Sequence, residues 1–225
     1  KPTPTNRLIQ GDVGSGKTIV ALYAMLLATA AGRQSALMAP TELLAEQHHA
    51  NITKILAGSG IRVDLLTGSM DPEERARTLA ALADGRTSIV VGTHALITEA
   101  VKFQSLALAV IDEQHRFGVH QRLALMEKGS GGGPRPHQLV MTATPIPRTL
   151  AMTAYADLDC SVIGELPPGR QPIKTVVLAE QRRPELVERV AAHCATGQQA
   201  YWVCPLIEES ELVDSQEDTE LGREL

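Results

Sequence analysis

The sequence predicts an α/β fold, a doubly wound and mostly parallel sheet with helices on both faces. Short apolar runs alternate with longer amphipathic stretches along most of the 225-residue chain, and this alternation is the signature of such folds. Runs that are apolar almost throughout, such as Ser88–Val91, are typical of parallel strands covered by helices on both faces. A glycine-rich turn joins the first apolar run to the first helix.

The elements follow in order, strands from the short apolar runs and helices from the amphipathic stretches between them. The expected strands are Arg7–Gln10, Ser35–Ala39, Arg62–Leu66, Ser88–Val91, Ala107–Ile111 and Gln138–Met141. The expected helices are Lys17–Ala31, Leu43–Leu56, Pro72–Ala83 and Gln121–Glu127. The most apolar stretch, Ile19–Ala31, is Ala-rich and shorter than the roughly 18 apolar residues of a membrane span. It therefore predicts a buried helix, and no membrane segment is expected.

Two breaks interrupt the alternation. Gly129–Pro136 is too glycine-rich to form an element and predicts a mobile surface loop. Glu165–Pro172 contains three prolines and predicts a stiffer connector, after which a new β-α-β cycle begins. Its expected elements are a strand at Lys174–Leu178, a helix near Pro184–Ala195 and a strand at Ala200–Cys204. We therefore expect a first domain at residues 1–165, and a connector and the start of a second α/β domain at residues 166–225.

The charge of the chain is unevenly distributed. The formal net charge is -5, from 21 Lys+Arg against 26 Asp+Glu. Residues 206–225 contain eight acidic residues and one basic residue, so the rest of the chain has 20 basic and 18 acidic residues. The acidic balance therefore does not exclude a nucleic-acid partner, whereas an aromatic content of 3% argues against extensive base stacking. Three cysteines without a C-x-x-C pair indicate a reducing compartment such as the cytoplasm, not disulfides or a zinc site.

The strongest local motif is Gly11-Asp12-Val13-Gly14-Ser15-Gly16-Lys17-Thr18, which fits G-x-x-x-x-G-K-T between a strand and a helix. Glycines let the backbone wrap closely around a phosphate, and the loop amides and the helix N-terminus then bind its charge. Lys17 is expected to reach the β and γ phosphates of ATP, and Thr18 to bind Mg²⁺. The loop residues expected to bind the nucleotide are Gly11, Gly14, Ser15, Gly16, Lys17 and Thr18.

A pair of carboxylates predicts catalysis at the same site. Asp112 and Glu113 follow the apolar run Leu108–Ile111, at the carboxyl end of a strand, where ligands of open α/β sheets bind. Asp112 is expected to hold Mg²⁺ through water, and Glu113 to orient and deprotonate the attacking water. A P-loop phosphotransferase is an alternative, as is a module that binds nucleotide without turnover. His48 and His49 form no zinc motif, and we expect them on a helix surface.

Six blocks of the sequence share motifs with a known family: Leu8–Thr18, Met38–His48, Val91–Ile97, Asp112–Val119, Met141–Leu150 and Leu166–Ile173. Together they resemble the superfamily 2 DExH helicases, in particular those that remodel branched DNA. The resemblance covers nearly the whole chain from Arg7 to about Glu211, and it implies a cytoplasmic protein associated with the bacterial nucleoid. The motor of a transcription-repair coupling factor is the nearest alternative, and Ser15, Gln114 and the proline-rich connector favour the branched-DNA helicases.

The resemblance implies a RecA-like P-loop NTPase lobe, followed by the start of a second RecA-like lobe. It also implies roles for further residues. Those expected to contact DNA are Pro40, Thr41 and Glu42, Gly68 and Ser69, and Gly92, Thr93 and His94. Those expected to couple hydrolysis to lobe movement are Gln114, His115, Thr142, Thr144 and Arg148. Small polar groups at strand ends suit contacts to phosphates without base readout.

In the family, two lobes clamp ATP and move along duplex DNA, remodelling stalled forks and recombination intermediates, while a separate wedge domain recognises the junction. The resemblance implies a monomeric motor whose arginine finger lies in the second lobe. We expect neither the wedge domain nor the arginine finger within this sequence. An arginine finger can contribute about 10³–10⁵ in rate, so this chain by itself should bind Mg-ATP weakly and show little DNA-stimulated turnover.

Overall fold

The computed structural model describes residues 4–113, 124–128, 135–144, 158–165 and 173–203. The chain divides into two compact units, Lys1–Arg170 and Gln171–Leu225. The strands of the first unit are β1 (Asn6–Gly11), β2 (Gln34–Met38), β3 (Val63–Leu66), β4 (Ile89–Gly92), β5 (Leu106–Asp112), β6 (His137–Thr142) and β7 (Asp159–Ile163). Its helices are α1 (Lys17–Ala30), α2 (Glu42–Ile55), α3 (Pro72–Ala83) and the short 3-10 helix η1 (His94–Ile97), and residues 124–127 are also helical.

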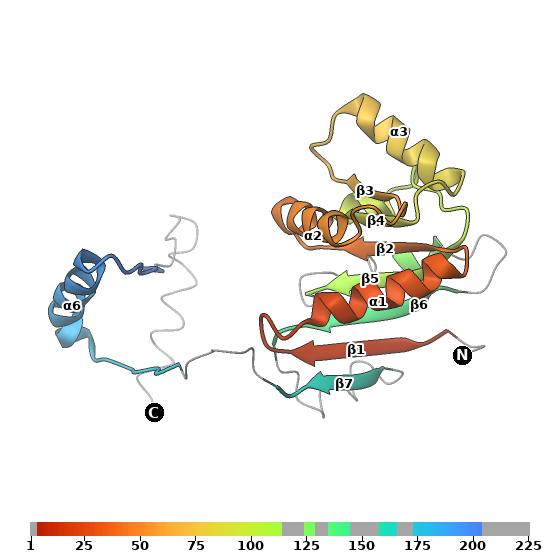
Figure 1. Ribbon diagram of the computed structural model, residues 1–225. Helices are drawn as coiled ribbons and strands as arrows, with labels where there is room; N and C mark the ends of the chain where they lie inside the picture. Colours follow the sequence, from red (N-terminus) through yellow and green to blue (C-terminus); the bar gives the residue numbers. More distant parts are fainter. Residues whose placement is uncertain (1–3, 114–123, 129–134, 145–157, 166–172, 204–225) are drawn as a thin grey trace, which may run out of the picture. The chain divides into compact units, whose positions relative to one another are not determined.

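The seven strands form one sheet in the order β3-β4-β2-β5-β6-β1-β7, and every pair is parallel (Figure 1). The α/β class and the parallel sheet expected from the sequence are thus confirmed. Because all strands run the same way, their carboxyl ends meet at one edge, which we call the carboxyl edge.

Alternate residues of the central strands enter two separate apolar cores, one on each face of the sheet. On one face, Leu37 of β2 and Val110 of β5 belong to the core that contains Met25 of α1 and Ile52 of α2. On the other face, Met38 and Ile111, together with α3, η1 and Leu125, belong to the second core. This two-residue alternation explains why β2 and β4 are buried at every position, as the continuous apolar runs predicted.

Six of the strands lie where the sequence predicted them, within one or two residues at each end. The helices α1, α2 and α3 also match in extent. The expectation that Ile19–Ala31 is buried is correct for one face only, because Ile19, Tyr23 and Leu27 are each more than half exposed. The helix α3 begins with Pro72 after Asp71, whose carboxylate accepts hydrogen bonds from the N–H groups of Glu73 and Glu74. The strand β7 was not predicted. It lies at the sheet edge and is largely solvent-exposed, so its sequence lacks the continuous apolar run of the central strands.

In the second unit, the predicted helix near Pro184–Ala195 is present as α6 (Arg183–Ala195), preceded by the 3-10 turn η3 (Glu180–Arg182). The predicted strands Lys174–Leu178 and Ala200–Cys204 are wrong over the residues that the structure describes there, which carry no strand assignment. A strand requires a hydrogen-bonded neighbour, and residues 173–203 provide no such pairing. The apolar side chains that prompted the prediction are exposed, Val177 by 96% and Val203 by 91%.

The described helices include none that is long and apolar enough to cross a bilayer. Among the described cysteines, Cys160 and Cys194 are free and exposed. Residues 129–134 of the predicted loop Gly129–Pro136 and residues 166–172 of the predicted connector Glu165–Pro172 lie outside the described residues.

Candidate nucleotide and DNA site

The predicted nucleotide motifs follow three neighbouring strands. The register pairs Asp112 of β5 with Met141 of β6, and Gln10 of β1 with Thr142 of β6. The carboxylates after β5, the threonines after β6 and the loop after β1 therefore lie side by side at the carboxyl edge. Segments separated by more than 120 residues in sequence thus meet in the part of the sheet where ligands of such folds bind.

The loop after β1 has the backbone conformation of a phosphate cradle. Gly14 and Gly16 have φ values of 82° and 90°, in the left-handed region that glycine adopts at no steric cost. Gly16 immediately precedes α1, which has no side-chain cap and no acidic residue in its first turn. The N-terminal amides of α1 and its positive dipole end therefore meet no competing carboxylate of the helix itself.

Lys17 lies across this loop. Its ammonium donates hydrogen bonds to the carbonyl oxygens of Gly11 at 2.7 Å and Asp12 at 2.9 Å. Both acceptors belong to the loop backbone, so the positive charge already lies where the loop turns.

Asp112 makes a contact that sequence reasoning missed. The Nε2–H of His48 donates a hydrogen bond to Oδ2 of Asp112 at 2.8 Å, and each side chain is 13% exposed. His48 was expected on a helix surface, and that expectation is wrong. It lies on the inward stripe of α2, three residues after Ala45 and four before Ile52, both fully buried. The helical spacing of this stripe was the signal in the sequence.

Glu113 has a strained backbone. Its φ of 50° is the only positive value of a non-glycine residue among the described residues. Its N–H donates to the carbonyl oxygen of Met141 at 3.0 Å, which ties the end of β5 to β6. The Thr142 hydroxyl approaches Oε2 of Glu113 at 3.5 Å and lies 2.9 Å from the Thr144 hydroxyl. The predicted base and the predicted coupling threonines therefore share one network.

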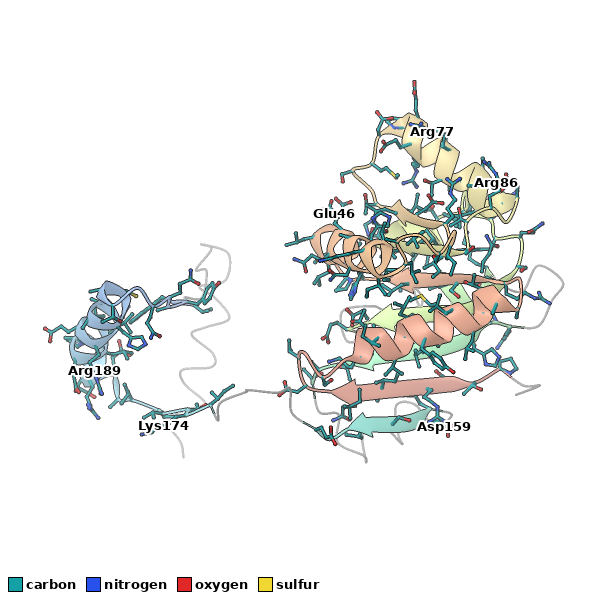
Figure 2. All side chains as sticks on the ribbon, in the orientation of Figure 1. Glu46, Arg77, Arg86, Asp159, Lys174 and Arg189 are labelled. Atoms are coloured by element: carbon teal, nitrogen blue, oxygen red, sulfur yellow. The ribbon has the colours of Figure 1, made fainter. Side chains whose placement is uncertain are left out.

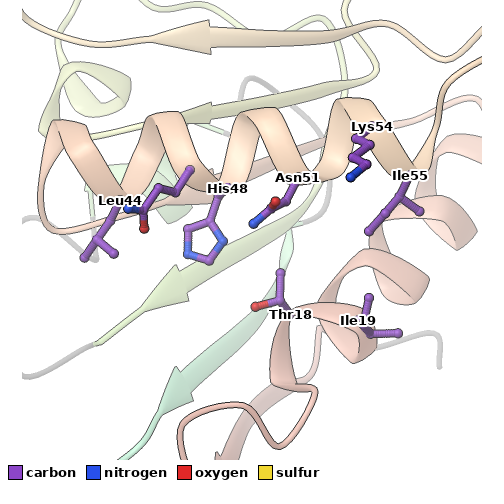
Figure 3. Close-up of a pocket in the computed structure, with 8 residues that line it drawn as sticks. Thr18, Ile19, Leu44, His48, Asn51, Lys54 and Ile55 are labelled. Atoms are coloured by element: carbon purple, nitrogen blue, oxygen red, sulfur yellow. The ribbon is translucent and has the colours of Figure 1, made fainter. Parts of the chain in front are cut away.

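A cavity of 530 Å³ lies between α1 and α2 (Figure 3). Thr18 projects into it from the first turn of α1, opposite His48 and Asn51 of α2. Thr18, predicted to bind Mg²⁺, thus borders the same cavity as the histidine that holds Asp112. Both predicted metal ligands are oxygen donors, the kind that Mg²⁺ takes.

The predicted DNA-contacting segments follow the other three neighbouring strands, β3, β4 and β2. Thr41 caps α2, its hydroxyl accepting from the N–H of Leu44 at 3.3 Å. Glu42 accepts hydrogen bonds from the N–H groups of Gly68 at 2.8 Å and Ser69 at 3.1 Å, and from the Ser69 hydroxyl at 2.6 Å. These bonds hold the pKa of the Glu42 carboxyl below its ordinary value, and the bond from the Ser69 hydroxyl has the largest effect.

The third predicted DNA-contacting segment is mostly inaccessible. Gly92 is buried, and a side chain there would collide with the backbone oxygen of Leu66. Thr93 is 2% exposed, and its hydroxyl has no hydrogen-bond partner within the described part of the chain. Of the three residues, His94 alone is exposed. The predicted coupling residues Gln114, His115 and Arg148 lie outside the described residues.

Comparison with known proteins identifies the family. The DEAD/DEAH box helicase family matches residues 3–153, about two thirds of the chain. The chain belongs to the DEAD/DEAH box helicase family. The helicase resemblance stated from the motifs is thus confirmed.

Individual helicases are similar over almost the whole chain. The chain is 61% identical over 214 residues to the ATP-dependent DNA helicase RecG of Escherichia coli K12, covering 95% of this chain and 31% of that protein. It is 55% identical over 225 residues to RecG of Pasteurella multocida, covering 100% of this chain and 32% of the relative. The chain thus spans about a third of the length of these relatives.

Solved structures agree with these relatives. A structure of RecG bound to a three-way DNA junction superposes with a TM-score of 0.76 at 42% identity, over 97% of this chain and 29% of that one. The helicase domain of Pyrococcus furiosus Hef matches 97% of this chain and 51% of its own, with a TM-score of 0.57 at 20% identity, and supports the fold alone. The described first unit therefore has the RecA-like helicase fold.

Proposed function

We propose that the chain is the ATP-binding lobe, with the start of a second lobe, of a DNA helicase that couples ATP hydrolysis to translocation along duplex DNA. The proposed substrates are branched DNAs, such as stalled forks and recombination intermediates, in bacterial DNA repair. The observation that carries the proposal is the likeness, over 97% of the chain, to RecG bound to a three-way junction. The proposed division is residues 1–165 for the first lobe and 166–225 for the connector and second lobe, acting as a monomer in the nucleoid.

The proposed chemistry assigns one task to each group at the carboxyl edge. The amides of Gly14 to Thr18 and the Lys17 ammonium hold the phosphates, and Lys17 exchanges the carbonyls of Gly11 and Asp12 for phosphate oxygens. Thr18 and Asp112 hold Mg²⁺, which when bound neutralises charge that develops on the phosphates. Glu113 orients the attacking water and accepts its proton, and its strained backbone supports a functional role.

The proposed DNA contacts lie beside β3, β4 and β2. Exposed Thr41 offers its hydroxyl to phosphate oxygens, and exposed His94 offers an imidazole. Ser69 is also exposed, and it would exchange its hydrogen bonds to Glu42 for bonds to phosphate. For Glu42 we propose an indirect part, because a carboxylate repels phosphate and its oxygens already bind Gly68 and Ser69. Gly92 and Thr93 are buried, so we propose that they act indirectly, by setting the backbone conformation at the end of β4 that precedes His94.

The proposed hydrolysis is tested by replacing Glu113 with Gln in a chain that carries both helicase lobes. We expect ATPase activity stimulated by a model fork to fall by about 10²-fold or more, because removal of a general base has this effect. Affinity for ATP should be retained, since the phosphate-binding groups are unchanged. Glu99→Gln, at an exposed position outside the site, is the matched control.

The same assay separates the competing functions. A nucleotide-binding module without turnover would show no fork-stimulated hydrolysis even in the wild type. A phosphotransferase would consume ATP in response to a small acceptor and not to DNA. Fork-stimulated hydrolysis that persisted unchanged in Glu113→Gln would remove Glu113 from the proposed role.

A further inference from the structure

We infer that His48 is a positioning residue for the metal site, holding Asp112 in the orientation that binds Mg²⁺. The inference rests on the proposed function, which assigns Mg²⁺ to Thr18 and Asp112. Its starting observation is the hydrogen bond from Nε2 of His48 to Oδ2 of Asp112, at 2.8 Å between two side chains that are each 13% exposed. Carboxylates that serve a metal are commonly oriented by such partners.

The environment of His48 is fixed by α2. Ala45 and Ile52, on the same stripe of the helix, are fully buried in the core on this face of the sheet. The imidazole of His48 therefore lies at the end of β5, and α2 cannot rotate without exposing this core. Asp112, the last residue of β5, is fixed by its register with Met141 of β6. Both partners of the bond thus come from rigid elements.

The position of the bond also distinguishes it from an ordinary packing contact. His48 lines the cavity into which Thr18 projects, so it lies beside both of the proposed metal ligands (Figure 3). The neighbouring His49 lies on the same helix, but its Nε2 is 3.3 Å from the carbonyl oxygen of Val63 in β3. Two adjacent histidines therefore contact different strands, and only His48 contacts Asp112.

His48 also lies six residues after Glu42, about 9 Å further along α2. At its first turn this helix holds Gly68 and Ser69 through Glu42, and at its second turn it holds Asp112 through His48. One rigid element thus contacts both the proposed DNA-binding loop and the proposed metal ligand. This arrangement gives the histidine a function at an inward position where an apolar residue would otherwise pack.

The test measures Mn²⁺ binding to the 225-residue chain in the presence of ATP, by electron paramagnetic resonance, which detects weak sites. We expect His48→Ala to raise the dissociation constant for Mn²⁺ about 10-fold or more, as loss of a ligand-orienting partner does elsewhere. His48→Gln, whose amide Nε2 can donate to the same carboxylate oxygen, should restore most of this affinity. His49→Ala should bind Mn²⁺ like the wild type. ATP binding measured in EDTA should be the same in all four proteins.

Three outcomes would overturn the inference. One is an unchanged Mn²⁺ affinity in His48→Ala, and another is an equal loss in His49→Ala. The third is a failure of His48→Gln to restore affinity although its thermal unfolding matches the wild type, which would assign the effect to packing. If instead the wild-type chain bound ATP neither with Mn²⁺ nor in EDTA, the proposed function itself would fail. That result differs from the three outcomes above, in each of which the wild-type chain binds ATP.

Discussion

At the residue scale, the most constrained position of the phosphate loop is Gly11. A Cβ there would lie 2.5 Å from the Ser15 hydroxyl oxygen and 3.1 Å from Cβ of Ile163 in β7. The loop therefore packs directly on the edge strand, and the Ser15 hydroxyl occupies the space that a side chain at Gly11 would need. Close approach disfavours any side chain here, whereas at Gly14 and Gly16 the backbone φ favours glycine.

We accordingly expect Gly11→Ala to displace the loop and β7. The predicted cost is about 1–3 kcal/mol of folding free energy, typical of overpacking, and a lower affinity for ATP. Gly164→Ala is the matched control, because a Cβ at Gly164 meets no heavy atom within 4 Å. Thermal unfolding and ATP titration measure both effects, and equal unfolding temperatures for the two variants would contradict the expectation.

Sequence reasoning located most of the proposed nucleotide site but missed His48. The phosphate loop and Asp112–Glu113 could be found because their residue types, spacing and neighbouring elements form a local pattern. The bond between His48 and Asp112 joins residues 64 apart, and no local pattern encodes it. The inward stripe formed by Ala45, His48 and Ile52 shows that His48 faces the interior, but only the sheet order shows that Asp112 is there.

At the element scale, α2 has both a cap and a clamp at its first turn. The cap is the hydroxyl of Thr41, and the clamp is the carboxylate of Glu42, which binds Gly68 and Ser69 after β3. The loop of small polar residues after β3 is thus fixed by a helix that begins after a different strand. This clamp explains how a Gly-Ser turn can present a defined surface.

The clamp predicts a pH dependence of stability. Since hydrogen bonds from Ser69 and Gly68 lower the pKa of Glu42 in the folded chain, the folded state binds this proton less readily than the unfolded state. The stabilisation is therefore complete at neutral pH, and is lost as the pH falls through the carboxyl range to the lowered pKa.

We expect Glu42→Gln to unfold at a lower temperature than the wild type at pH 7, with the difference shrinking as the pH falls. Glu46→Gln, one turn further along α2 at an exposed position (Figure 2), is the control and should follow the wild type at every pH. Thermal unfolding across the acidic range checks the expectation. A difference between Glu42→Gln and wild type that did not change with pH would show that the charge of Glu42 has no part in it.

The strands themselves show what sequence can predict at this scale. Central strands such as β4 are buried on both faces, so their consecutive residues are apolar. The sequence therefore predicted the bounds of these strands nearly correctly. The edge strand β7 is held instead by Arg7, which donates to Ser161 at 2.7 Å and to Asp159 at 3.1 Å, and by pairing with β1. Conversely, Lys174–Leu178 has a strand-like composition but no partner among residues 173–203. Pairing is not local, and composition alone cannot predict it.

At the scale of the whole molecule, the carboxyl edge divides into two halves. The proposed nucleotide groups follow β5, β6 and β1, and the proposed DNA groups follow β3, β4 and β2. The halves meet where β2 pairs with β5, and α2, which follows β2, contacts Asp112 at the end of β5. The parallel sheet thus places the proposed nucleotide and DNA groups at one edge, and the single helix α2 contacts both halves.

The division into two compact units leads to a prediction about truncation. Because Lys1–Arg170 contains the whole sheet and both apolar cores, a chain ending at Arg170 should fold by itself. Its unfolding temperature should lie within about 2 °C of that of the corresponding transition in the full chain, since an independent domain keeps its own core. Its affinity for ATP should be within about twofold of the affinity of the full chain.

A second truncation, only twelve residues shorter, supplies the contrast. A chain that ends at Leu158 lacks β7, and with it the pairing to β1, the contacts of Arg7 and the Ile163 side chain beside Gly11. We expect this chain to unfold at a lower temperature and to bind ATP more weakly, because the strand that supports the phosphate loop then becomes the sheet edge. Calorimetry and ATP titration of both truncations measure the difference. Unfolding of the Arg170 chain would mean that residues 171–225 belong to its core, and normal ATP binding by the Leu158 chain would mean that β7 does not support the loop.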